Sequence, residues 1–190
     1  FYRVVKFLLM KFIELNKEIF LCQMPEEIVQ EIEEWKIACD KIKNHKLSFL
    51  KSHENIGTLT NAYQCSVPYN IIKNSFWLPY CLRMSSNIFK VEHRELSIRE
   101  WVGHFDAMDV WINYSYKGNY NPRHTHTGFL SGVIYLQNED YTHFTNLDFK
   151  YKGNKGDMII FPSSTPHEVK KQEKDYERIT FAFNVSRYVS

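Results

Sequence analysis

The stretch from Met108 to Tyr116 alternates between two sets of side chains along the chain. The first set is Met108, Val110, Ile112, Tyr114 and Tyr116, and the second is Asp109, Trp111, Asn113 and Ser115. A pattern with a period of two is typical of a β-strand whose two faces meet different surroundings. The stretch therefore predicts a sheet that is packed on one side and carries mostly polar groups on the other.

Six more short segments with strand character follow at close spacing. They are residues 123–127, 131–137, 145–151, 156–162, 167–171 and 178–185. Seven short strands separated by turn-forming residues indicate a β-sandwich or barrel. The C-terminal half, residues 105–190, is expected to form this barrel.

The N-terminal half, residues 1–104, is expected to support the barrel with helices. One helix should begin near Pro25, with acidic residues in its first turn, and end near Lys46. Its apolar residues recur at helical spacing and predict packing against a sheet: Ile28, Ile32, Trp35, Cys39 and Ile42. A second helix is predicted over 72–90, a short strand or edge segment over 13–22, and mostly loop with one short strand over 47–69. The chain is thus expected to be one domain, residues 1–190, of the α+β class and mainly β.

Composition excludes several classes of protein. A net charge of +2, without a dense cluster of Lys and Arg, argues against a nucleic-acid partner. The apolar start of the chain is interrupted by Arg3, Lys6 and Lys11, so it fits neither a membrane span nor a signal peptide. The four cysteines are scattered; they could form two disulfides, but free and mostly buried thiols are expected. A cytoplasmic protein is expected.

Three histidines form the candidate metal site. His124 and His126 are two residues apart, so on an extended segment their Cβ atoms lie on one face, about 6–7 Å from each other. His167 follows at the end of another predicted strand. Imidazoles on rigid strands of a barrel suit a first-row metal ion with open positions for ligands.

Arg178 and Thr180 share one face of the last predicted strand. A guanidinium and a hydroxyl placed in this way can bind one carboxylate group. The alternative for Arg178 is a surface salt bridge with Glu177 or Asp175. Tyr135 either points into the same cavity, where it would bind the same carboxylate, or is a core tyrosine.

Several motifs, taken as a set, resemble a family of 2-oxoglutarate- and Fe(II)-dependent oxygenases of bacteria and phages. The resemblance covers about residues 105–185. Its motifs are Trp111-x-Asn113, His124-x-His126, Ser131-Gly-Val-x-Tyr135, Gly156 to Phe161-Pro-Ser163, His167 and Arg178-Ile-Thr-x-x-Phe-Asn184.

The resemblance implies a double-stranded β-helix, which is a jelly-roll or cupin-like barrel, and an enzyme that uses Fe(II) and 2-oxoglutarate. It assigns the iron to His124, His126 and His167, and the distal carboxylate of 2-oxoglutarate to Arg178 and Thr180, with help from Tyr135 and Asn113. Such an enzyme hydroxylates a substrate with O2 and releases succinate and CO2. The substrate is expected to be a small molecule or a peptide, with no nucleic acid and no membrane involved.

One position departs from the pattern. The wider superfamily has Asp or Glu where this chain has His126, which gives two histidines and one carboxylate on the iron. Three alternatives follow: His126 is a ligand in a three-histidine site, a carboxylate elsewhere such as Asp109 or Asp148 replaces it, or the site is redox-silent.

Two other functions compete with the oxygenase. Gly118 precedes His124, and Gly156 and Pro162 precede His167, at spacings similar to the cupin motifs. The glutamate that cupins place after the first histidine pair is absent from 127–132, which favours the oxygenase over a cupin-like metalloprotein of another reaction class. The third alternative is a non-catalytic barrel that binds a carboxylate ligand or a partner.

Overall fold

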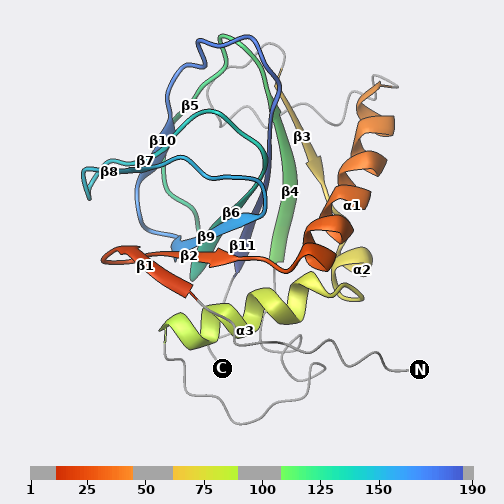
Figure 1. Ribbon diagram of the computed structural model, residues 1–190, viewed down its shortest axis with the longest axis horizontal. Coiled ribbons are helices and arrows are strands. Elements are labelled where there is room, and N and C mark those ends of the chain that lie inside the picture. The colour runs from red at the N-terminus through yellow and green to blue at the C-terminus, as the bar shows by residue number, and fades with distance from the viewer. Residues whose placement is uncertain (1–11, 45–61, 90–107, 186–190) are drawn as a thin grey trace.

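The computed structural model describes residues 12–44, 62–89 and 108–185 and contains two antiparallel sheets (Figure 1). The large sheet, in spatial order, consists of β1 (Phe12–Asn16), β2 (Ile19–Gln23), β9 (Asp157–Pro162), β6 (Leu130–Gln137), β11 (Arg178–Val185), β4 (Met108–Ser115) and β3 (Tyr63–Ser66). The small sheet consists of β5 (Asn121–His124), β10 (His167–Val169), β7 (Thr142–Phe144) and β8 (Phe149–Tyr151). This arrangement confirms the predicted mainly β fold of the jelly-roll type.

The large sheet has two different faces, as the alternation in β4 predicts. Val110, Ile112 and Tyr114 of β4 belong to a large apolar cluster that also contains residues of the helices. Phe181 of β11 lies in the same cluster, and its ring centroid is 4.9 Å from that of Trp77. The other face of the large sheet meets the small sheet in a second apolar cluster: Ile19, Tyr135, Phe144, Ile159 and Phe161. The helices therefore cover one face and leave the other for the interior of the barrel (Figure 1).

The first helix follows the sequence prediction closely. α1 (Glu26–Asn44) begins directly after Pro25 and buries Ile28, Ile32 and Cys39. Negative side chains in its first turn stabilise the positive end of the helix dipole. No helix in the described parts of the chain is both long and apolar enough to cross a membrane.

The second predicted helix starts later than expected. Residues 69–89 form a short α2 (Tyr69–Ile72) and a longer α3 (Trp77–Phe89) instead of one helix from residue 72. The carboxylate of Glu31 on α1 accepts hydrogen bonds from the backbone N–H groups of Phe76 and Trp77. Backbone N–H groups at the start of a helix have no partner within it. The distant Glu31 therefore helps to fix where α3 begins, together with Ser75, whose Oγ accepts from the backbone N–H of Leu78 at 3.1 Å.

Three strand predictions also needed correction. The segment 13–22 is not one strand but the hairpin β1–β2, which turns at Lys17 with a positive φ of 34°. The segment 145–151 contains only β8, because the chain turns at Leu147 and Asp148, and β7 lies before it. β5 ends at His124, so His126 lies just beyond the strand rather than on it. The N-terminal half thus supplies β1, β2 and β3 to the large sheet in addition to its helices.

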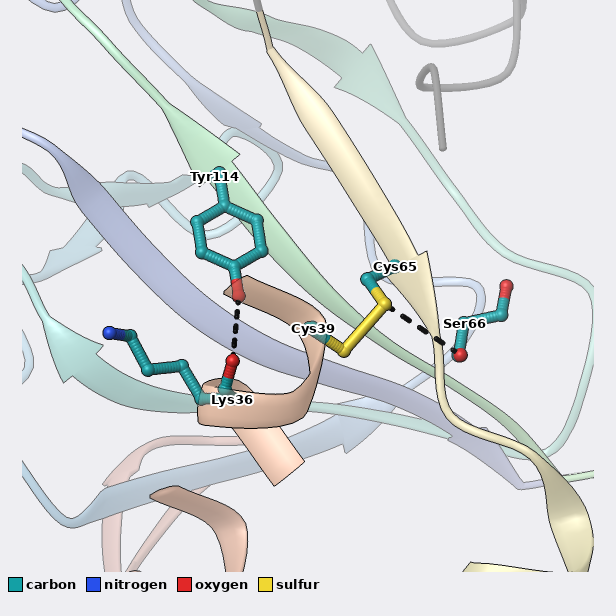
Figure 2. Close-up of a disulfide and its surroundings, with 5 residues drawn as sticks. All are labelled: Lys36, Cys39, Cys65, Ser66 and Tyr114. Atoms are coloured by element: carbon teal, nitrogen blue, oxygen red, sulfur yellow. Dashed lines mark hydrogen bonds between the residues drawn. A yellow bond between two sulfur atoms is a disulfide. The ribbon is translucent and has the colours of Figure 1, made fainter. Parts of the chain in front are cut away.

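Two cysteines are paired, contrary to the prediction of four free thiols. A disulfide joins Cys39 of α1 to Cys65 of β3, the edge strand of the large sheet (Figure 2). Nearby, the hydroxyl of Tyr114 donates to the backbone carbonyl of Lys36, 3.3 Å away (Figure 2). Cys22 and Cys81 are free and buried, as predicted, and burial raises the pKa of the Cys22 thiol to about 12. The missed pair is 26 residues apart in sequence, and only the packing of α1 against β3 brings the two sulfur atoms together.

Gly132 of β6 occupies a position where residues of the neighbouring strands β9 and β11 leave no room for a side chain. A Cβ atom there would lie 2.1 Å from the Phe183 ring and 2.8 Å from the carbonyl oxygen of Ile159. We expect Gly132→Ala to lower the free energy of unfolding by about 1–3 kcal/mol, because the ring and the neighbouring strand must move.

Chemical denaturation measures this loss, and Gly118→Ala is the matched control. Gly118 has a φ of +88°, but a Cβ atom added to it would have no other atom within 4 Å. Its replacement should therefore cost only the backbone strain, about 1 kcal/mol. A Gly132→Ala protein that unfolds no more easily than Gly118→Ala would contradict the packing described here.

Candidate metal centre and anion site

The three predicted histidines converge in the interior of the barrel. His124 of β5 and His167 of β10 are paired directly across the two strands. His126 lies beside them, and the potential ligand nitrogens of all three side chains are within 4.8 Å of one another. The strand pairing therefore brings together two segments that are more than forty residues apart.

Backbone carbonyl groups orient two of the imidazole rings. Nδ1 of His124 lies 2.7 Å from the carbonyl oxygen of Pro122, and Nδ1 of His167 lies 3.0 Å from that of Thr165. A carbonyl oxygen can only accept, so Nδ1 carries the hydrogen and the lone pair of Nε2 remains free for a metal ion. The backbone N–H of His126 donates to the carbonyl oxygen of Ser163 at 2.9 Å, which holds this residue beyond the end of β5.

Burial keeps the three imidazoles neutral. Loss of solvent lowers the pKa of His167 to about 3 and that of His126 to about 4, and nearby histidines lower both further. Burial also lowers the pKa of His124. A neutral imidazole is the form that binds a metal, and a set of three such nitrogens fits a first-row ion such as Fe(II).

No carboxylate joins this group among the described residues. Asp109 and Asp148, the two sequence candidates for a replacement ligand, are both exposed and lie outside the cluster. Of the three alternatives for His126, the geometry is consistent with a three-histidine ligand set.

A cavity extends from the histidines along the inner face of the large sheet. Its polar walls come from several strands, and its apolar walls include Trp111, whose ring centroid is 6.0 Å from that of His126. The polar lining residues other than the histidines are Gln64, Asn113, Asn121, Ser131, Thr142, Arg178 and Thr180. The cavity therefore contains Arg178, Thr180 and Asn113, which the sequence motifs assign to the cosubstrate.

Arg178 is a buried cation without a carboxylate partner among the described residues. Its side chain is only 7% exposed, and burial lowers its pKa, although an arginine stays charged in a protein. Its Nε donates to Oδ1 of Asn138 at 2.7 Å. The alternative of a surface salt bridge is wrong, since Glu177 instead accepts from Lys43 and Tyr116, and Asp175 is exposed.

Thr180 takes part in a row of polar side chains across three strands. Nε2 of Gln64 on β3 donates to Oδ1 of Asn113 at 2.9 Å, and Nδ2 of Asn113 lies 3.4 Å from Oγ1 of Thr180. Because the hydroxyl oxygen of Thr180 accepts this contact, its hydrogen is free to be donated into the cavity. Gln64 was missed by the sequence prediction, although its alternation with Tyr63 and Cys65 across a short strand is a weak signal for it.

The structure places the rings of Tyr135 and Phe129 outside the cavity lining. Tyr135 is not among the residues that line the cavity; it is fully buried, and its hydroxyl hydrogen-bonds Thr142 at 2.8 Å. The structure thus favours a core tyrosine that contacts the cavity-lining residue Thr142 without lining the cavity itself. A contact between Tyr135 and a cosubstrate stays a prediction. Phe129 packs against the large apolar cluster rather than lining the cavity, in contrast to Trp111.

Comparison with known proteins agrees with the chemistry of this site. Residues 143–184, which include His167, Arg178 and Thr180, match the family described as "Putative 2OG-Fe(II) oxygenase". The chain is similar to the 2-oxoglutarate- and Fe(II)-dependent oxygenases. The resemblance inferred from the sequence motifs is thereby confirmed, and it supports an oxygenase with a candidate iron site at the three histidines.

Solved structures with a similar fold include a hydroxylase and an oxygenase. A prolyl-4-hydroxylase from Pseudomonas putida is 14% identical, with a TM-score of 0.56 over 88% of this chain and 90% of that one. A "Putative oxygenase" from Shewanella oneidensis is 10% identical, with a TM-score of 0.57 over 91% and 83% of the two chains. At such low identity these likenesses establish the fold. No curated protein sequence matches the chain.

We expect His167→Ala to weaken the binding of Fe(II) or Zn(II) about 100-fold or more, because it removes a ligand from the most buried position of the cluster. Competition with a chromophoric chelator measures the metal affinity. His143→Ala is the matched control, since His143 lies on the neighbouring strand β7 and outside the cluster.

His126→Asp extends the same test to the unusual ligand. An aspartate would restore two histidines and one carboxylate, so this variant should bind the metal at least as tightly as the wild-type protein. Full metal occupancy in His167→Ala, or an effect of equal size in His143→Ala, would show that the metal binds elsewhere.

Proposed function

We propose that the protein is a 2-oxoglutarate- and Fe(II)-dependent oxygenase that acts on a small molecule or a peptide. The observation that carries the proposal is Arg178, a buried cation without a carboxylate partner among the described residues, in the same cavity as three neutral histidines. A buried charge is costly unless it is paired, so this position calls for an anionic ligand. The family match over 143–184 supports 2-oxoglutarate as that ligand.

In this proposal, each polar residue of the cavity has a separate task. His124, His126 and His167 bind the iron, which supplies the activation of O2 and the oxidation of the cosubstrate. Arg178 binds the distal carboxylate of 2-oxoglutarate, and Thr180 donates its free hydroxyl hydrogen to the same group. Asn113 holds the Thr180 hydroxyl in place and is itself held by Gln64.

The charge of the cavity favours an acidic cosubstrate. None of the described residues that line it is Asp or Glu, and Arg178 is the one permanently charged side chain among them. Three neutral ligands also leave the full charge of the metal ion uncompensated, whereas a carboxylate ligand would cancel part of it. A dianion such as 2-oxoglutarate brings one carboxylate to the metal ion and one to Arg178, and so offsets two of the three positive charges.

One feature favours a second candidate, a cupin-like metalloprotein of another reaction class. A neutral three-histidine set differs from the two histidines and one carboxylate of most 2-oxoglutarate oxygenases. Such a protein would bind its own substrate on the metal without a cosubstrate. This candidate gives no role to the buried Arg178, and we therefore rank it second.

We expect Arg178→Ala to raise the dissociation constant for 2-oxoglutarate about 100-fold, because a two-pronged, charge-assisted contact is lost. The affinity for the metal should change by less than about twofold, since Arg178 does not belong to the histidine cluster. Isothermal titration calorimetry of the Zn(II)-loaded protein measures both affinities without turnover.

Arg123→Ala is the control for a general loss of positive charge. Arg123 lies on β5 next to His124 but is exposed and does not line the cavity, so its removal should leave 2-oxoglutarate binding nearly unchanged. Equal affinity of Arg178→Ala and the wild-type protein for 2-oxoglutarate would remove Arg178 from the proposed site.

A further inference from the structure

We infer that Asn138 is a positioning residue that holds Arg178 so that a carboxylate must bind the two terminal nitrogens of its guanidinium. The inference rests on the proposed function, since it concerns how the cavity binds the distal carboxylate of 2-oxoglutarate. It starts from the contact already described, in which Nε of Arg178 donates to Oδ1 of Asn138 at 2.7 Å.

The hydrogen bonds of Asn138 allow one orientation of its amide. Nδ2 donates to the backbone carbonyl oxygens of Asp140, at 2.9 Å, and Gly153, at 3.1 Å. Carbonyl oxygens only accept, so the NH2 group must face them and the amide oxygen must face Arg178. Both amide hydrogens of Asn138 are thus donated to backbone carbonyls, and this fixes the amide oxygen that accepts from Nε of Arg178.

The loop that carries Asn138 is itself held in place. The hydroxyl of Tyr176 donates to the carboxylate of Asp140 at 2.8 Å and accepts from the backbone N–H of Glu139 at 2.9 Å. The backbone N–H of Asn154, next to Gly153, donates to Asp157 at 2.7 Å. Asn138 is therefore fixed by two loops and by the segment that precedes β11.

The contact with Asn138 decides which edge of the guanidinium can receive a ligand. A carboxylate can bind an arginine either through Nε and one terminal nitrogen, or through both terminal nitrogens. Since Nε is used by Asn138, the second geometry remains, and it directs the carboxylate end-on toward Arg178.

Asn138 also holds the guanidinium of Arg178 in this orientation without cancelling its charge. An amide oxygen is neutral, whereas an aspartate at the same place would form a buried ion pair and compete with the ligand. Asp140, the acidic neighbour that affects the pKa of Arg178, accepts from Tyr176 instead of pairing with the guanidinium. The guanidinium of Arg178 is thereby held in one orientation, and its charge remains available for an anionic ligand.

The first test compares two 2-oxoacids that differ in the distal carboxylate. We expect Asn138→Ala to raise the dissociation constant of the Zn(II)-loaded protein for 2-oxoglutarate about 10-fold, because one hydrogen bond to a charged group is lost. Pyruvate can chelate the metal but has no distal carboxylate, so its dissociation constant should change by less than about twofold. A merely structural role for Asn138 would weaken both ligands equally and would overturn the inference.

A double-mutant cycle shows whether Asn138 acts through Arg178. Arg178→Lys keeps a positive charge but lacks Nε, so adding Asn138→Ala to it should change 2-oxoglutarate binding by less than about twofold. The matched control is Asn154→Ala, which replaces an exposed asparagine of the neighbouring loop and should leave both 2-oxoacids unaffected. The same 10-fold loss in the Arg178→Lys background would contradict the inference.

NMR of the wild-type protein tests the geometry without any substitution. Addition of 2-oxoglutarate should shift the terminal N–H resonances of Arg178 and leave its Nε–H resonance nearly in place. A larger shift at Nε–H would mean that the carboxylate displaces Asn138. This result would contradict the inference about Asn138 but not the proposed function. If the wild-type protein binds pyruvate and metal but no 2-oxoglutarate, both the proposed function and the inference about Asn138 are wrong.

Discussion

The structure depends on the central strands of the large sheet, which pack against the helices on one face and line the interior of the barrel on the other. On β4 and β11, alternate side chains pack against α1 and α3, and the residues between them face the interior of the barrel. The helix-facing residues are apolar and rigidly packed, with Trp77 in contact with both Phe181 and Phe183. This packing fixes the backbone of β11, and so it also fixes Arg178 and Thr180 on the other face.

The part of this arrangement that could be predicted is the part that is local in sequence. The alternation of β4 revealed its two faces, and the spacing of His124 and His126 predicted a pair of candidate ligands, which the structure brings close to His167. The same period of two predicted that Arg178 and Thr180 share one face of the last strand. The prediction of a cavity that joins them needed only the assumption that these strands close into one barrel, which the structure confirms.

The parts that could not be predicted depend on contacts between distant segments. Glu31 sets the start of α3, and the packing of α1 on β3 pairs Cys39 with Cys65. Asn138 reaches Arg178 from a loop forty residues earlier, and its role is visible only when the partners of its amide are known. Gln64 lies in a segment whose composition is mostly typical of a loop, and its alternation with Tyr63 and Cys65 gives only a weak signal for its role. No periodic pattern in the sequence records such contacts.

In the proposed function, the cavity binds Fe(II) and 2-oxoglutarate together and uses them with O2. The most direct measurement is the anaerobic addition of Fe(II) and then 2-oxoglutarate to the purified protein, followed by admission of O2. We expect a visible charge-transfer absorption that requires both additions, and its decay in O2 with release of succinate. Metal binding without this absorption and without succinate would contradict the proposed oxygenase function and would favour the cupin-like alternative.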